Sequence, residues 1–175
     1  QRKRKWELFP NSKKENVPSE KKYIEFLYDT YNSVHAITFG VDKFKLSNID
    51  GNNRINAIVH FVDEPLSLFP EKLYKLKEFI TTNIDKNIAD EIEKIMIKMS
   101  YEELMLFKYN KYFIEKGLND LYNTHLKKLR DELEPYFEEL IDSMKINNKD
   151  RFDNDVQINV NIFTGYTRSE EHTSE

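Results

Sequence analysis

Hydrophobic residues recur at two different spacings along this chain, and the change of spacing predicts helices followed by strands. A helical stripe over residues 19–32 follows Ser19, a residue type that caps helix N-termini. The spacing then shifts to two, which predicts strands over 34–41 and 44–49. Residues 55–62 have apolar side chains at both alternating sets of positions, so we predict an inner strand there, after a turn at Asp50–Asn53.

Helical spacing returns after two prolines. Pro70 suits the first turn of a helix that reaches about Asn83, and a second helical pattern follows over 84–99. The residues Ser100–Glu103 have the form of a capping box and predict a new helix start. The alternative is one unbroken helix over about 85–116.

The strongest local pattern lies between Gly117, a helix stop signal, and residue 144. Its spacing is close to a heptad seam, and Pro135 must kink or restart the helix. Two helices joined at Gly117 predict an antiparallel hairpin. The seam consists of Tyr122, Leu126, Leu129, Leu133, Tyr136, Leu140 and Met144.

A polar loop over 147–155 precedes a clean alternation of apolar and polar residues over 156–162. We expect a half-exposed, antiparallel strand there. The clustering of helices between strands favours an α+β fold over alternating α/β. The predicted architecture is a small, mainly antiparallel sheet of three or four strands, with a helical hairpin inserted before the last strand.

The two ends of the sequence differ from its middle. Residues 168–175 resemble the translation of a common short-read sequencing adapter, and we expect them not to be natural protein. Residues 1–18 are basic and lack periodicity, which predicts a linker or arm. We therefore expect a single domain over 19–167, truncated at both ends.

Composition narrows the chemistry. The chain has no Cys, which excludes disulfides and thiolate zinc sites, and its four Gly residues are too scattered for a phosphate-binding loop. At 39% apolar it can form a core, yet it has no run of about 20 apolar residues, so we predict a cytoplasmic protein without membrane contact or cofactor. The net charge of −4 disfavours nucleic acid, except at the basic run Arg2–Lys5.

One catalytic hypothesis rests on His60, Tyr74 and Lys77. Rolling-circle nickases pair histidines on a strand with a helical Tyr-x-x-Lys, whose Tyr attacks a phosphodiester. This chain has one such His where those enzymes usually have two. The alternative interpretation is a structural or solvent-facing histidine.

An acidic stretch offers a metal hypothesis. Asp150, Asp153 and Asp155 could ligate Ca²⁺, although their spacing does not match an EF-hand. A solvated turn is the alternative interpretation.

Aromatic residues are dense over 101–113, where they cover most of a helix circumference. Tyr101, Tyr109 and Tyr112 are the candidate partner-binding residues, because Tyr is enriched at interfaces. The alternative is a helix covered on both sides within its own domain.

The functional prediction is therefore a non-catalytic interaction module of a larger intracellular protein, binding a protein partner or a second copy through its helices. The alternative is a lobe of a nucleic-acid-processing enzyme, nickase-like or nuclease-like. Its basic arm would lie near the substrate and its main catalytic residues would lie outside this sequence.

Overall fold

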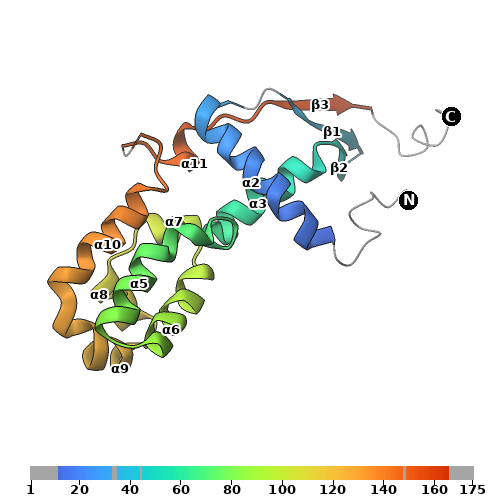
Figure 1. The fold of residues 1–175 in the computed structure, drawn as a ribbon. Helices are drawn as coiled ribbons and strands as arrows, with labels where there is room; N and C mark the ends of the chain where they lie inside the picture. Colours follow the sequence, from blue (N-terminus) through green and yellow to red (C-terminus); the bar gives the residue numbers. More distant parts are fainter. Residues whose placement is uncertain (1–11, 33–34, 44, 148, 166–175) are drawn as a thin grey trace. The chain divides into compact units, whose positions relative to one another are not determined.

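The computed structural model describes residues 12–32, 35–43, 45–147 and 149–165. They form an α+β fold, in which many short helices accompany a small mixed sheet (Figure 1). This confirms the predicted fold class. In the described residues, no helix is both long and apolar enough to cross a membrane.

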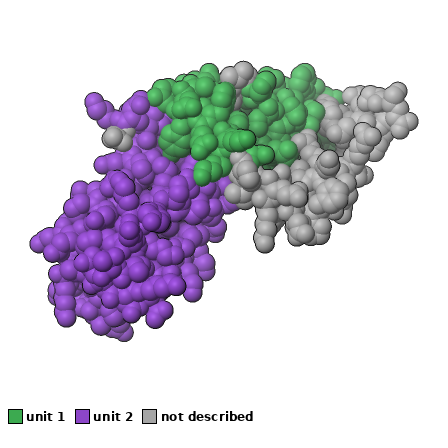
Figure 2. All heavy atoms as spheres, in the orientation of Figure 1, with its two compact units in different colours: residues 1–59, 153–175 green, residues 60–152 purple. Residues whose placement is uncertain are grey.

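The chain divides into two compact units, coloured separately in Figure 2. Unit 1 comprises 1–59 and 153–175, and unit 2 comprises 60–152. The chain passes between units within helix α3 (Asn52–Asp63) and again at α11 (Phe152–Asp155). Each unit is described here by itself.

Unit 1 begins with helix α2 (Ser12–Thr30), which buries Ile24 and Leu27 completely. The predicted start at Ser19 is wrong, because the helix continues through Pro18. Proline removes one backbone N–H from the helix ladder, and in a helix of 19 residues that loss does not end the helix. Residues 1–11 of the predicted arm lie outside the described residues.

The strands β1 (Ile37–Asp42) and β2 (Lys45–Asp50) form an antiparallel hairpin, close to the two predicted strands. Gly51 follows β2 with φ at +91°, a conformation that favours glycine. A Cβ at Gly51 would lie 3.2 Å from the Ile37 Cα atom, so the close approach of these two segments also needs a glycine.

The last strand, β3 (Val160–Thr164), is parallel to β1 and gives the sheet order β2-β1-β3. The predicted antiparallel pairing is wrong, because the chain returns to β1 through the whole of unit 2 and not through a short turn. The predicted inward face is wrong as well, since Val160 and Ile162 are 49% and 60% exposed.

The predicted inner strand at 55–62 is wrong, because these residues form helix α3. Ala57 and Phe61 are both buried and lie four positions apart, which is one helical turn. The apolar residues at 55, 58, 59 and 62 fit spacings of three and four as well as alternation. No Gly or Pro interrupts the segment, so the helix prevails.

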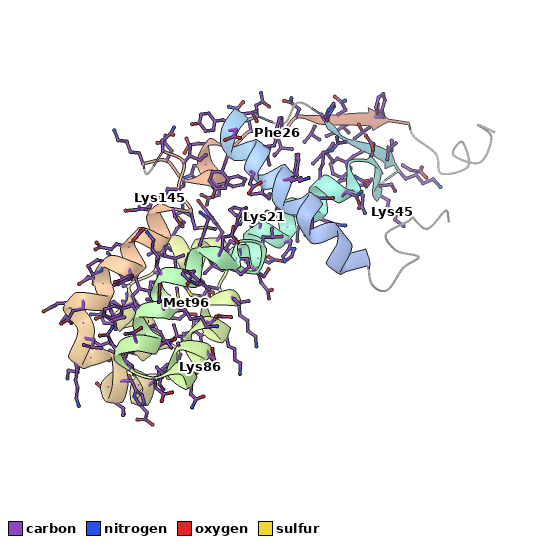
Figure 3. All side chains as sticks on the ribbon, in the orientation of Figure 1. Lys21, Phe26, Lys45, Lys86, Met96 and Lys145 are labelled. Carbon is purple, nitrogen blue, oxygen red and sulfur yellow. The ribbon has the colours of Figure 1, made fainter. Side chains whose placement is uncertain are left out.

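Unit 2 confirms the helices predicted after the prolines. Pro65 begins the short helix α4 (Pro65–Leu68), and Pro70 begins a 3₁₀ turn that leads into α5 (Tyr74–Asn83). Helix α6 (Lys86–Ile97) follows, capped by Asp85. Met96 near its end is completely buried, whereas Lys86 at its start is exposed (both labelled in Figure 3).

The predicted capping box is confirmed, with the Ser100 and Glu103 side chains each accepting a hydrogen bond from the other residue's backbone N–H. It starts α7 (Tyr101–Met105), which ends after five residues, so the single helix over 85–116 is wrong. Helix α8 (Tyr109–Glu115) ends at Gly117, whose φ is +72°. The N–H groups of residues 117 and 118 bond to the carbonyls of 114 and 113, which is the Schellman pattern.

The long second helix of the predicted hairpin is broken into shorter pieces. Helix α9 (Asn119–Leu121) passes into a π-helical turn (Tyr122–Leu126), a 3₁₀ turn (Lys127–Leu129) and α10 (Arg130–Asp142). The π-helical turn is wider than an α-helical turn and the 3₁₀ turn is tighter, so both shift the helical register. Most residues of the predicted seam are nevertheless buried. Its buried members are Tyr122, Leu126, Leu133, Leu140 and Met144.

An aromatic cluster forms the core of unit 2 beside the end of α10. The Phe61 ring lies 4.6 Å from Phe152 and 5.2 Å from Tyr101, measured between ring centroids. The Tyr101 hydroxyl accepts a hydrogen bond from the Phe152 N–H at 2.9 Å and donates to the Met144 carbonyl at 3.3 Å. Tyr101 therefore contributes both apolar contact and hydrogen bonds to the core.

Replacing Ser100 with Ala should lower the free energy of unfolding by about 1 kcal/mol, because the Glu103 N–H loses its acceptor. Urea denaturation at neutral pH measures the change. Ser100→Asp is the matched control, since aspartate also accepts at an N-cap, and it should stay near the wild-type stability. An S100A chain as stable as the wild type would contradict a stabilising capping box.

Candidate functional site

The three residues of the nickase hypothesis have separate local partners. The His60 Nε2 atom, near the end of α3, lies 2.6 Å from the hydroxyl oxygen of Ser67 on α4. The Lys77 ammonium group pairs with Asp90 at 3.2 Å and Glu93 at 2.5 Å. Tyr74 is 67% exposed at the start of α5. The contacts of His60 and Lys77 described above are to other residues, and the catalytic role of the three stays a prediction.

The metal hypothesis finds no support in the geometry. Within the described ranges, no group of three or more His, Asp or Glu side chains is arranged to hold a metal ion. Asp153 and Asp155 belong to the short helix α11, so the predicted loop over 147–155 is wrong at its end. Asp150 instead takes part in a backbone turn, where its carbonyl accepts from the Ile146 N–H.

The three candidate tyrosines differ in their burial. Tyr101 and Tyr109 are only 1% and 4% exposed, whereas Tyr112 is half-buried. Phe107 lies 5.1 Å from the Tyr112 ring, and the Lys116 ammonium lies 5.5 Å from it. Tyr101 and Tyr109 therefore offer little surface to a partner. The groove beside them is the stronger candidate site.

That groove, which we call the α10 groove, has a volume of about 530 Å³. One wall is the chain between α7 and α8, over residues 105–110, and the other is α10 with Lys145 beyond its end. On the α10 side, its lining residues are Glu134, Phe137, Glu138, Ile141, Asp142 and Lys145.

Aromatic rings form the floor of the α10 groove. The Tyr109 ring stacks on Phe137 at 5.1 Å with an interplanar angle of 6°, and the Phe107 ring lies 5.2 Å from Phe137. Leu106 stands at the edge and is 64% exposed, and Ile141 is half-buried. The three rings are themselves buried, so the apolar surface that a partner's side chain can cover comes from Leu106 and Ile141.

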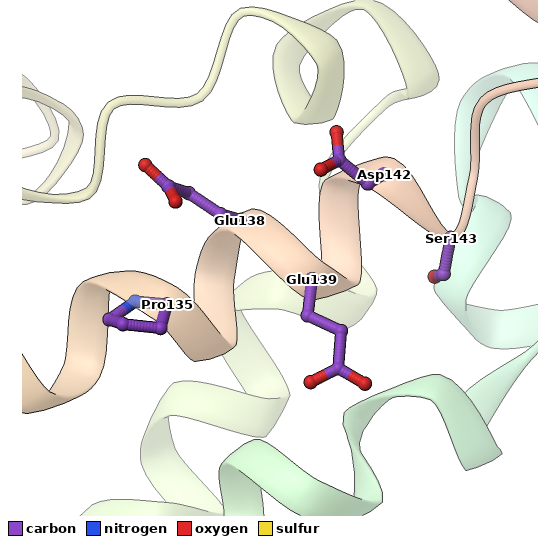
Figure 4. Close-up of a pocket in the computed structure, with 5 residues that line it drawn as sticks. All are labelled: Pro135, Glu138, Glu139, Asp142 and Ser143. Atoms are coloured by element: carbon purple, nitrogen blue, oxygen red, sulfur yellow. The ribbon is translucent and has the colours of Figure 1, made fainter. Parts of the chain in front are cut away.

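Carboxylates follow the α10 side of the groove. Figure 4 shows Glu138 and Asp142 on one side of α10 and Glu139 on the other. Glu139 pairs with Lys75 on α5 at 2.5 Å, and Asp142 pairs with Lys145 at 2.9 Å. Glu138 has no ion-pair partner in the described part of the chain, and it also lines a second, shallow hollow of about 430 Å³.

Glu134 is the other unneutralised carboxylate of the wall, since no ion pair with a described residue involves it. It is exposed and lies one helical turn before Glu138, so both carboxylates project along the same side of α10. The opposite wall contributes Lys108, which is exposed. The two walls of the groove therefore carry unpaired charge of opposite sign.

Tyr109 has an unusual hydroxyl group. Its oxygen is buried and has no hydrogen-bond partner among the described residues. Burial, with smaller contributions from Tyr122, Glu134 and Asp131, raises the pKa of Tyr109 to about 12, although Arg130 opposes the shift. An unpaired buried hydroxyl costs free energy, so the stacking of this ring on Phe137 must outweigh that cost.

Comparison with known proteins identifies no relative: none of the family models, curated proteins or solved structures compared with this chain matches it. The function is therefore argued from geometry alone.

The seam predicted from the sequence includes Tyr136 but not Phe137. The signal was present in the spacing, because Phe137 lies next to the seam residue Tyr136 and one turn after Leu133. No sequence pattern indicated that α7 ends after five residues. This early end places residues 105–110 opposite α10.

Two hydroxyl deletions should have opposite consequences for stability. Tyr101→Phe removes the acceptor of the Phe152 N–H and should cost about 1–3 kcal/mol of unfolding free energy. Tyr109→Phe removes a buried hydroxyl without a partner and should be neutral or stabilising. Urea midpoints of the two variants measure this, and equal destabilisation by both would contradict the described hydrogen bonding.

The ionisation of Tyr109 predicts a pH dependence. Its folded pKa of about 12 lies above the unfolded value of about 10. The contribution of the protonated hydroxyl to the free energy of unfolding is therefore complete below pH 10 and is lost as pH rises through 12. The Tyr109→Phe chain lacks this loss. Above pH 10, the wild type should therefore lose stability relative to Y109F by roughly 1.4 kcal/mol per pH unit. Parallel stability curves for the two chains would contradict the burial of the hydroxyl.

Proposed function

We propose that this chain is a protein-interaction module that binds a short segment of a partner protein in the α10 groove. The observation that carries the proposal is the coexistence, in one groove, of accessible apolar side chains at Leu106 and Ile141 and unneutralised carboxylates. Such a groove suits a peptide that places an apolar side chain on the floor and a charged side chain at the wall.

The charge on α10 indicates which peptides fit. The helix carries six carboxylates and one arginine, and the groove-lining Glu134 and Glu138 lack ion-pair partners in the described ranges. A Lys or Arg beside an apolar residue would gain a charge-assisted contact there. The supported partner is therefore a basic and apolar segment, with its cation against α10.

Lys108 on the opposite wall gives the segment a direction. A cation of the peptide is repelled by the Lys108 side and attracted by the α10 side, so the two walls together select one placement. This account also predicts that removing the positive charge of Lys108 improves the fit for a basic peptide.

Binding of a synthetic probe tests the proposal. A synthetic peptide in which Lys and Leu residues alternate, with both ends capped, should bind the full chain. Isothermal titration calorimetry at low ionic strength measures this binding. Glu138→Lys should weaken this binding at least about tenfold, because it places like charge at the wall. The affinity should also fall as salt rises, since the contact is partly exposed.

Two matched variants separate the groove from general electrostatics. Glu91→Lys makes the same charge change at an exposed position of α6 outside the groove and should leave the affinity within about twofold. Lys108→Glu should strengthen the binding. Equal losses from E138K and E91K, or a weaker complex with K108E, would overturn the proposal, as would a peptide with Asp in place of Lys binding equally well.

A further inference from the structure

The outer edge of β3 is a second surface of interest, and it belongs to unit 1. Among the described strands, the sheet order β2-β1-β3 gives β3 a neighbour on one side only (Figure 1). All five residues of β3 are exposed, including Val160 at 49%, Ile162 at 60% and Phe163 at 57%. This strand therefore contacts β1 through its backbone and buries almost none of its apolar side chains.

The edge also lacks the charges that usually protect a strand from other strands. One third of the residues in this chain are charged, yet the twelve residues over 156–167 contain none. The opposite edge strand, β2, has Lys45 at its start and Asp50 at its end. Figure 3 shows Lys45 projecting at that end of β2. Of the two edges, β3 is the one open to pairing.

The backbone groups of β3 set the geometry of such pairing. The Asn159 carbonyl accepts a hydrogen bond from the Ile37 N–H at 2.9 Å, so the backbone of residue 159 faces β1. Alternate residues of a parallel strand face the same neighbour. The N–H and C=O groups of Val160, Ile162 and Thr164 therefore face outward.

We propose that β3 pairs with β3 of a second copy of this chain, in antiparallel orientation, with Ile162 on the twofold axis. In this register Ile162 lies opposite Ile162 of the partner, and Val160 lies opposite Thr164 of the partner. These are the hydrogen-bonded pairs of an antiparallel ladder, and together they can form about six backbone hydrogen bonds. The two sheets then join into one.

A second copy is the occupant because the strand is complementary to itself. The twofold axis brings Ile162 to its own counterpart, so a charge at that position would meet a like charge. The uncharged sequence over 156–167 avoids that repulsion. The contact is small beside a standard interface of roughly 1,600 Å², which predicts a weak dimer that forms reversibly with concentration.

Charge placed on the axis tests the register. The full wild-type chain should show a monomer–dimer equilibrium in sedimentation equilibrium at concentrations up to about 1 mM. Ile162→Lys and Ile162→Glu should each raise the dimer dissociation constant at least about tenfold, because like charges then lie opposite each other. An equimolar mixture of I162K and I162E should dimerise again, and Ile162→Thr should behave as the wild type.

A cross-link provides a measurement that does not depend on charge. The chain has no Cys, so Ile162→Cys introduces a single thiol. A hydrogen-bonded antiparallel pair holds its Cα atoms about 5.5 Å apart, within the range that a disulfide spans. Mild oxidation should convert I162C to a covalent dimer, whereas Leu46→Cys on the exposed face of β2 should stay largely monomeric.

Three results would overturn the proposal. The first is a wild-type chain that is monomeric at every concentration, and the second is a dimer that I162K leaves intact, which would place the interface elsewhere. The third is equal cross-linking of I162C and L46C, which would indicate random collision. Binding of a basic peptide to the α10 groove is a separate measurement, so neither result decides the other.

Discussion

The packing of Phe107 and Tyr109 on Phe137 is the contact on which the arrangement around α10 depends. The chain between α7 and α8 continues the last turn of α7 through the Leu106 and Phe107 N–H groups, and the Phe107 and Tyr109 rings anchor it to α10 at 5.2 and 5.1 Å from the Phe137 ring. Stacked aromatic pairs contribute about 0.5–1.5 kcal/mol beyond their burial. That gain offsets the unpaired hydroxyl of Tyr109 and holds the buried ring cluster beneath the groove.

The same packing explains why α10 presents so much unneutralised charge. A helix uses one face for the core, here through Leu133, Phe137 and Leu140, and its remaining faces must carry polar residues. Lysines from α5 and from the end of α10 neutralise Glu139 and Asp142. Residues 105–110 supply only Lys108 to the remaining side. The proposed specificity for a basic segment therefore follows from where the neighbouring elements place their cations.

Local signals in the sequence predicted the features that depend on local chemistry. Pro70, the capping box at Ser100 and the stop at Gly117 are decided by backbone groups within a few residues, and all three are confirmed. The strand assigned to 55–62 failed because its apolar spacing fits both periods, and the exposure of Val59 between the buried Ala57 and Phe61 is what distinguishes them. The direction of β3 and the site at α10 depend on contacts between distant segments. No spacing rule encodes that Phe107 meets Phe137.

The most direct test of the account is a methyl and amide NMR titration of the full chain with the basic and apolar peptide. The predicted shifts concentrate on Leu106, Ile141 and the backbone of residues 105–110, with little change at Val160 or Ile162. Shifts that spread evenly over the acidic surface, or that gather outside the α10 groove, would contradict the claim that this groove binds the partner.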